Sequence, residues 1–538
     1  MRARRDRRAR YCRPVEDRVR TAEVIAALSL GTDLAMELPL EHGLESTLVA
    51  LRLGERLGID AATASQTYYA CLLFYVGCTA DAEVAAEIFD GDLHEEFLPA
   101  LFGSRPQARR GLTRALASPE LPAPVRAMRI ARRLPAAVRG HPRHLAALCE
   151  VGQMLALRLG LPPPVQGLFS TFAERWDGKG WPGTAKGEEL PLAVRIAHVA
   201  RDAAYHRLLG GPELAARVVR ERAGAAFDPA IARPCADHAA EILAFDAATP
   251  AWEETLEREP GRSLTLEGDA VDRALAAIGD FADLISPYLA GHSQGVADLC
   301  SKAAQRCGLG EDDAVTTRRA AFVHDLGRVA VAARIWQKPG ALSTDEREKV
   351  RLHPYHTERV LCRSRFLTVL APVASADHER LDGSGYHRGT PGAALAPAAR
   401  ILAAADAYRA MLEPRPHRDA LAPAAAAELL GAEASAGRLD ADAVTAVLEA
   451  AGQRAPRIAR PAGLTEREAE VIRLLARGLQ TKQVARALGI SVKTADTHIQ
   501  SAYRKIGVST RAAAALFAME HGLATSGELP IGRPAPRP

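Results

Sequence analysis

Histidine and aspartate residues recur between positions 292 and 406 in a pattern suited to binding metal ions. The residues that share these types are His292, His324, Asp325, His353, Asp377, His378 and Asp406. Adjacent His and Asp within the apolar stretch AAFVHDLG are costly to bury unless a cation compensates their charge. Imidazole nitrogens combined with carboxylate oxygens suit Fe, Mn, Zn or Ni. The sequence therefore predicts a site for divalent transition metals.

Asp325 is the residue best suited to join two ions, because a carboxylate has two oxygens. Paired ions about 3.5–4 Å apart clamp a phosphodiester and lower the pKa of a water between them. We therefore expect a centre with two ions and hydrolytic chemistry.

An internal repeat determines where these residues lie. His42 and His292 are each followed by glycine 16 residues later, and by another glycine 19 residues after that. The segment ERWDGKGWPGTAKGEELPLAVRI from Glu174 resembles ERLDGSGYHRGTPGAALAPAARI from Glu379. The intervening stretches show the three-and-four spacing of amphipathic helices. Two copies of one helical domain explain these matches.

The first copy lacks the metal ligands of the second. It has Phe74–Tyr75 at the His–Asp position, Phe172–Ala173 at the Asp–His position and Arg201 at the position of Asp406. Hydrophobic side chains cannot ligate metal, so we expect no catalysis there. Ligand binding, packing against the second copy, or both, remain open as its role.

The composition favours a helical, intracellular protein. The chain has 538 residues and a net charge of +4, with 48% hydrophobic, 25% charged and 5% aromatic residues. Cores built from Ala and Leu favour helices, and we expect an all-α fold. The eight cysteines are scattered, which indicates a reduced cytosol. No run of apolar residues without a charge reaches 18 residues, the length that a membrane-spanning helix needs. We therefore expect a cytoplasmic protein without a membrane partner.

Shifts in composition divide the chain into seven parts. We expect a basic disordered arm at 1–20, the degenerate repeat at 21–245, a linker at 246–270, the metal-binding repeat at 271–452, a second linker at 453–462, a small C-terminal domain at 463–525 and a disordered tail at 526–538.

Residues 463–523 have the signals of a helix-turn-helix. Thr465 and Glu468 form a T-x-x-E capping box that opens a helix, and Gly478 ends it. Gly489 and Ser491 then separate two further helices. The segment carries nine basic and five acidic residues, a balance that suits a polyanion. A helical adaptor for another protein is the alternative.

This segment resembles the LuxR-type DNA-binding domain in LTEREAEV, VARALGIS, KTADTHIQ and KIGVSTR, a span of about sixty residues. The resemblance implies a four-helix domain that binds double-stranded DNA and dimerises through its last helix, so we expect a homodimer. The implied DNA contacts are Thr481, Lys482, Lys493, Thr494, Thr497, His498 and Lys505.

The second copy resembles the HD-GYP family of metal-dependent phosphodiesterases, which hydrolyse cyclic di-GMP. The resemblance rests on GHS, HDLGR, HP, DHERLDGSGY and AADAY between 278 and 430. It implies two HD-domain-like helical bundles in tandem, with His324, Asp325 and Arg328 as catalytic residues of the second. It also implies substrate contacts from Arg328, Asp382, Gly383, Gly385 and Tyr386.

Three departures from the family pattern bear on activity. Asp377–His378–Glu379 replaces the HHE motif, Gly385–Tyr386–His387 replaces GYP, and Arg328 replaces a lysine that contacts phosphate. The leading interpretation is a transcription regulator whose second repeat senses or hydrolyses a cyclic dinucleotide. One alternative is an enzyme whose DNA-binding domain serves only to localise or regulate it. The other is an inactive sensor or dimerisation scaffold.

Overall fold

Helices make up almost all of the regular structure. The computed structural model describes residues 17–77, 102–118, 120–246, 249–456, 458 and 460–524. Within these residues the strands are β1 (Arg18–Arg20) and β2 (Thr265–Glu267), which pair antiparallel. The expected all-α fold is therefore confirmed. The chain forms two compact units, one from Glu16–Ala290 and Asp325–Thr368, the other from Gly291–His324 and Val369–Pro538.

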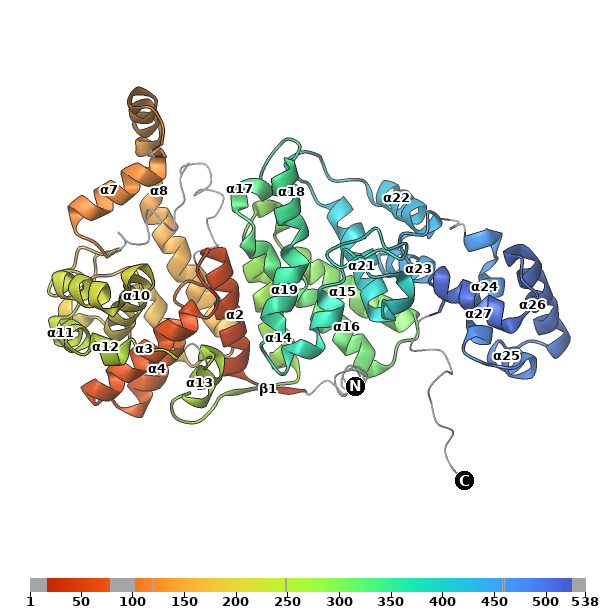
Figure 1. Cartoon of the computed structure of the whole chain (residues 1–538), viewed down its shortest axis with the longest axis horizontal. Helices are drawn as coiled ribbons and strands as arrows, with labels where there is room; N and C mark the ends of the chain where they lie inside the picture. Colours follow the sequence, from red (N-terminus) through yellow and green to blue (C-terminus); the bar gives the residue numbers. More distant parts are fainter. Residues whose placement is uncertain are drawn as a thin grey trace. The chain divides into compact units, whose positions relative to one another are not determined.

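The first unit contains the helices of the first repeat. Helix α10 (Leu192–Arg222) packs against α3 (His42–Leu57), α4 (Ala61–Leu72) and α11 (Pro229–Asp237). The other α-helices of this unit are α2 (Thr21–Ala35), α7 (Arg105–Leu116), α8 (Ala123–Arg158), α9 (Pro163–Gln166), α12 (Ala239–Ile242), α13 (Ala251–Glu257), α14 (Asp269–Asp283), α17 (Ala333–Trp336), α18 (Thr344–Arg351) and α19 (His353–Leu361) (Figure 1). Small and aliphatic side chains fill the core, as the composition predicted.

The second unit is built around α15 (His292–Arg306). This helix packs against α16 (Glu311–Val323), α21 (Pro397–Leu412) and α23 (Ala441–Ala450). Helices α20 (Ala371–Ala374) and α22 (Pro423–Ser435) pack on α21. Three of the seven sequence-predicted metal ligands come from this group of helices, because α15 and α21 carry His292 and Asp406 and His324 directly follows α16.

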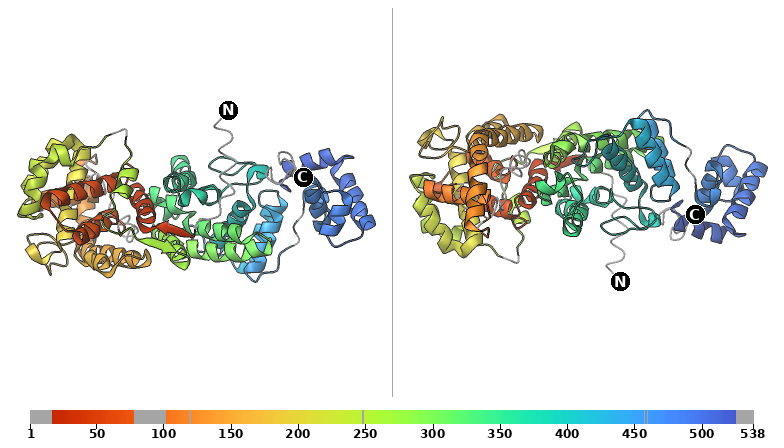
Figure 2. Two further views of the ribbon diagram at one scale, coloured as in Figure 1. Left: turned by 90° about the horizontal axis from the view of Figure 1, so that it is seen from below. Right: turned by 90° about the horizontal axis from the view of Figure 1, so that it is seen from above.

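The C-terminal helices of the second unit form a small domain of their own. They are α24 (Glu466–Ala476), α25 (Thr481–Ala487), α26 (Val492–Ile506) and α27 (Arg511–Glu520), which lie together at the blue end of the chain (Figure 2). The capping box at the start of α24 forms as expected, and the Ser491 hydroxyl accepts from the Thr494 N–H at the start of α26. The arrangement of two helices separated by a short turn matches the helix-turn-helix expectation.

The glycine-rich loops of the two repeats have the same backbone geometry. A Cβ on Gly180 would lie 2.4 Å from Glu174 Cα, and a Cβ on Gly385 would lie 2.5 Å from Glu379 Cα. In both loops the buried glutamate accepts hydrogen bonds from backbone N–H groups about ten residues further on. Both positions therefore require glycine, which explains why the motif persists in the degenerate copy.

Two expected boundaries differ from the structure. The predicted linker at 246–270 holds helix α13 and strand β2, and the last residues of the predicted N-terminal arm form β1. Val19 and Leu266 are buried partners in this small sheet, which is why the segments are ordered. Residues 1–16 of the arm and the predicted tail at 526–538 lie outside the described residues.

Candidate metal centre and DNA-binding domain

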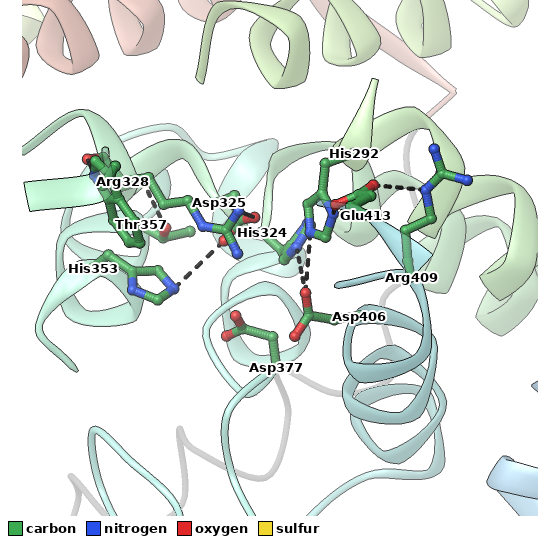
Figure 3. Close-up of polar contacts among 12 residues, drawn as sticks. His292, His324, Asp325, Arg328, His353, Thr357, Asp377, Asp406, Arg409 and Glu413 are labelled. Atoms are coloured by element: carbon green, nitrogen blue, oxygen red, sulfur yellow. Dashed lines mark hydrogen bonds and ion pairs between the residues drawn. The ribbon is translucent and has the colours of Figure 1, made fainter. Parts of the chain in front are cut away.

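Three buried residues from different helices of the second unit converge. Gly291, in the left-handed conformation, begins α15 and places His292 at its first turn, while His324 follows the last residue of α16. His292 Nε2 lies 3.1 Å from Asp406 Oδ1, and His324 Nε2 lies 3.7 Å from the same oxygen (Figure 3). The ligand atoms of His292, His324 and Asp406 all lie within 4.8 Å of one another.

The orientation of His292 is fixed by a carboxylate that the sequence analysis missed. His292 Nδ1 lies 2.9 Å from Glu413 Oε2, and Arg409 donates to the same carboxylate at 2.8 Å (Figure 3). Arg415 donates to it as well, at 3.0 Å. Burial opposes ionisation of Glu413, but the contact with His292 and the two arginines lower its pKa. An ionised Glu413 therefore accepts a hydrogen bond from Nδ1–H and directs Nε2 toward Asp406, as outer carboxylates do for metal-binding histidines.

His324 and His353 are oriented in the same way by backbone carbonyls. His324 Nδ1 lies 2.7 Å from Ala321 O, and His353 Nδ1 lies 2.7 Å from Val350 O. Donation from Nδ1 leaves Nε2 as the nitrogen with a lone pair. In both residues this nitrogen points toward a carboxylate, so each imidazole presents the atom that a metal would bind.

Asp377, His378 and Asp406 extend the cluster in the second unit. Asp377 is fully buried, and His378 Nε2 lies 3.3 Å from its Oδ2. His378 Nδ1 lies 3.9 Å from Asp406 Oδ2. Asp406 is buried as well, at 2% exposed. This combination of buried carboxylates and imidazoles fits a transition metal.

Asp325 and His353 form the corresponding set in the first unit. His353 Nε2 lies 3.5 Å from Asp325 Oδ1, and Arg328 Nη1 lies 2.8 Å from Asp325 Oδ2 (Figure 3). The Arg328 side chain, which we expected to contact phosphate, also lies over the ring of Trp336. Because Asp325 directly follows His324, the two sets of residues are joined by one peptide bond.

The expected substrate loop lies beside His378. The Tyr386 ring stacks on the His378 imidazole with centroids 4.7 Å apart. Asp382 Oδ1 accepts from the Ser384 N–H and hydroxyl, which shapes the turn that contains Gly383. The structure therefore places Tyr386 next to a sequence-predicted metal ligand, while Asp382 serves the loop itself.

The residues expected to contact DNA lie on α25 and α26. Four of them are exposed, namely Lys482, Lys493, Thr494 and Thr497, while Thr481 and His498 are half-buried. Lys505 differs, because its ammonium donates to Glu468 Oε2 at 2.6 Å and to Gly463 O at 3.1 Å. Partial burial opposes the shift, but Lys505, Ser501 and Thr465 lower the pKa of Glu468 to about 2. Lys505 therefore stabilises the domain in the absence of DNA.

Comparison with known proteins identifies two domains in the chain. Residues 277–443 match the HD domain family, and residues 462–518 match the bacterial regulatory proteins of the luxR family. The chain therefore carries an HD domain followed by a LuxR-type helix-turn-helix domain, and its relatives are cyclic-nucleotide phosphodiesterases of the HD-GYP type.

Three relatives show how far the similarity extends. The chain is 26% identical to 3'3'-cGAMP-specific phosphodiesterase 3 of Vibrio cholerae, over 73% of this chain and 87% of the relative. It is 40% identical to the cyclic di-GMP phosphodiesterase response regulator RpfG of Xanthomonas campestris, over 21% of this chain and 30% of that protein. The crystal structure of the V. cholerae cyclic GMP-AMP phosphodiesterase V-cGAP3 superposes with a TM-score of 0.55. At 23% identity over 81% of this chain and 98% of that one, it shows the same fold.

No helix among the described residues is both long and apolar enough to cross a membrane.

Proposed function

We propose that the HD domain is a metal-dependent phosphodiesterase for cyclic dinucleotides and that the chain is a transcription regulator. The observation that carries the proposal is the common orientation of three buried imidazoles. His292, His324 and His353 each donate from Nδ1 and present Nε2 to a carboxylate. This arrangement prepares nitrogen ligands before a metal arrives. The proposed ligands for two ions are His292, His324, Asp325, His353, Asp377, His378 and Asp406.

The residues of the site divide the work of the reaction. Bound ions supply Lewis acidity that polarises a phosphodiester and acidifies water. Arg328 carries the positive charge nearest to Asp325 and contacts a substrate phosphate once it leaves that ion pair. The Tyr386 ring, half-buried beside His378, offers a face on which a base can stack.

The relatives indicate which substrates to test first. The relative with the longest match described above is specific for 3'3'-cGAMP, and RpfG acts on cyclic di-GMP. Purified chain, stripped of metal and reloaded with Mn²⁺ or Fe²⁺, should cleave one of these two dinucleotides, and Asp325→Asn should not. Absence of both bound metal and cleavage under every loading condition would contradict the proposal.

An inactive sensor is the second candidate, and two observations favour it. Arg328 occupies one oxygen of Asp325, the residue expected to join two ions, at 2.8 Å. The loop also has His387 where the family has proline. A sensor would bind the same dinucleotide with metal present and release it unchanged, which distinguishes the two candidates in one assay.

The DNA-binding role rests on the exposed positive and hydroxyl side chains of α25 and α26. Removal of residues 456–538 should abolish duplex binding, and binding by the full chain should weaken steeply with salt. A homodimer would present two such domains to a palindromic site. Such a role places the proposed site of action in the cytoplasm. Undiminished binding by the shortened chain would contradict this assignment and would indicate that the Arg-rich N-terminus binds the DNA instead.

A further inference from the structure

The first repeat encloses a cavity of about 340 Å³ within the first unit. Phe74, Phe102, Phe172 and Trp181 line it, together with Arg175 and Lys179. Small-molecule sites in proteins occupy roughly 300–1,000 Å³ and combine mostly apolar walls with a few polar groups. The cavity has this size and this mixture of side chains.

The cavity lies where the second repeat carries its metal ligands. Phe74 has the position of His324, and Phe172 has the position of Asp377. Gly77 approaches the backbone of Leu148 in the same way that Gly327 approaches the backbone of His353. The scaffold has thus kept the hollow while aromatic rings have replaced the ligating groups.

The walls offer flat faces to a ligand. The Phe74 and Phe172 rings are stacked on each other with centroids 5.2 Å apart, and Phe74 and Trp181 are half-buried. Stacking on aromatic side chains binds nucleobases without regard to their hydrogen-bonding pattern, because every base has a π-face. A planar heterocycle is therefore the apolar part of the ligand that these walls fit.

A buried positive charge lies directly behind the walls. The Arg201 guanidinium lies 4.4 Å from the ring centroids of Phe74 and Tyr75 and 5.4 Å from that of Phe102. Arg201 is 3% exposed, and among the described residues no carboxylate forms an ion pair with it. Cation–π contacts offset part of the cost of burying this charge. An anionic ligand in the cavity would offset more.

The rim of the cavity adds further positive charge. Lys179 is exposed, and its ammonium lies 3.6 Å from Asp177 Oδ2. Arg175 also contacts Asp177, so two cations share one carboxylate at the rim. These three residues together carry a net charge of +1 at the mouth, which favours an anion there, while the aromatic walls favour a flat ring inside.

We infer that the first repeat binds a nucleotide, with its base among the aromatic rings and a phosphate at Lys179 and Arg175. The site does not hydrolyse the ligand, because the metal-ligand positions hold Phe74, Tyr75, Phe172, Ala173 and Arg201. It therefore acts as a second, regulatory nucleotide site, and it does not depend on the activity proposed for the second repeat. A mononucleotide and one half of a cyclic dinucleotide offer this chemistry equally.

The test uses the full chain in EDTA with Tyr386→Ala, which removes the stacking face of the second repeat. Isothermal titration calorimetry with GMP, AMP, 3'3'-cGAMP and cyclic di-GMP should show one binding event per chain for at least one of them. Mononucleotide and cyclic arms distinguish the two sources of the ligand. Adding Lys179→Glu should weaken that event about tenfold or more, because it replaces an attraction to phosphate by a repulsion.

Lys186→Glu is the matched control, since Lys186 is exposed in the same loop but does not line the cavity. Its affinity should equal that of the Tyr386→Ala parent. Ala173→Leu, which adds bulk to the cavity wall, should abolish the event while the circular dichroism spectrum stays unchanged. No binding of any of the four nucleotides, or equal affinity with Lys179→Glu and Lys186→Glu, would overturn the inference.

Discussion

The two repeats carry side chains of opposite charge at the same position of a shared helical fold. In the second, Asp406 lies 3.1 and 3.7 Å from the Nε2 atoms of His292 and His324, in the site that we propose for a metal ion. In the first, Arg201 has that position and brings the positive charge with it, surrounded by Phe74, Tyr75 and Phe102. The comparison teaches that the centre of this fold needs a positive charge, which either an ion or a side chain can supply.

The largest expected effect separates the repeats by metal content. Asp406→Asn should remove bound transition metal and with it any hydrolysis, because the carboxylate faced by two imidazoles loses its charge. Arg201→Ala at the equivalent position should leave metal content unchanged. Elemental analysis of the two purified variants checks this, and equal loss in both would break the comparison.

A smaller effect is expected from Glu413, which orients His292 without facing the metal. Glu413→Gln should weaken metal binding about 10–100-fold, as loss of an outer carboxylate does. The residue 205 positions earlier is Leu208, which is exposed. Leu208→Gln is therefore the control and should bind metal like the parent. Competition with a chelator of known affinity measures both.

The pH dependence of stability should also differ between the equivalent residues His42 and His292. Burial and the charges of Arg201 and Arg207 lower the pKa of His42 to about 3. The unfolded chain takes up this proton near pH 6.5 and the folded chain does not. Stability is therefore full above pH 6.5 and falls as the pH drops toward 3, by about 2 kcal/mol at pH 5.

His42→Gln should remove this contribution, so its melting temperature should fall less than that of the parent between pH 7.5 and 5. His198, whose pKa is lowered to about 4 by burial first and by Arg201 and Arg175, leaves the parent some further acid sensitivity. Identical slopes for parent and variant would show that His42 is protonated in the folded chain.

The smallest effects lie in the DNA-binding domain, which serves as a reference outside the repeats. Lys493→Ala should weaken DNA binding several-fold and reduce the salt dependence by about one ion. Lys505→Ala should weaken it less, because Glu468 already holds that ammonium, and should instead lower the thermal stability of the domain. Fluorescence anisotropy at several salt concentrations checks the order.

Local signals in the sequence predicted most of the fold. The capping box of Thr465 and Glu468 forms as expected, because it depends on residues three positions apart. Segment 246–270 was predicted as a linker, yet it holds α13 and β2. Its order depends on Val19 and Leu266, which are far apart in the chain. Pairings at such distances leave no local signal.

The residues of the candidate site also fall into those that the sequence indicated and those that it did not. Residue types and spacing indicated the histidines and aspartates, because ligands must be of those types. They did not indicate Glu413, whose contact with His292 joins residues 121 positions apart. Nor did they indicate that Arg328 pairs with Asp325, since charged residues three positions apart are common without contact. The pair of Lys505 and Glu468 joins two helices across 37 positions, which leaves no local signal.

The guanidinium of Arg201 has a consequence for the living cell. Iron, manganese and zinc rise and fall with nutrition, and a chelator can withdraw them. A charge that is part of the polypeptide cannot be withdrawn in this way. The first repeat therefore keeps its centre intact in metal starvation, while the metal site that we propose in the second would depend on supply. One chain thus combines a repeat whose structure is independent of the metal supply with a repeat whose proposed site would respond to it.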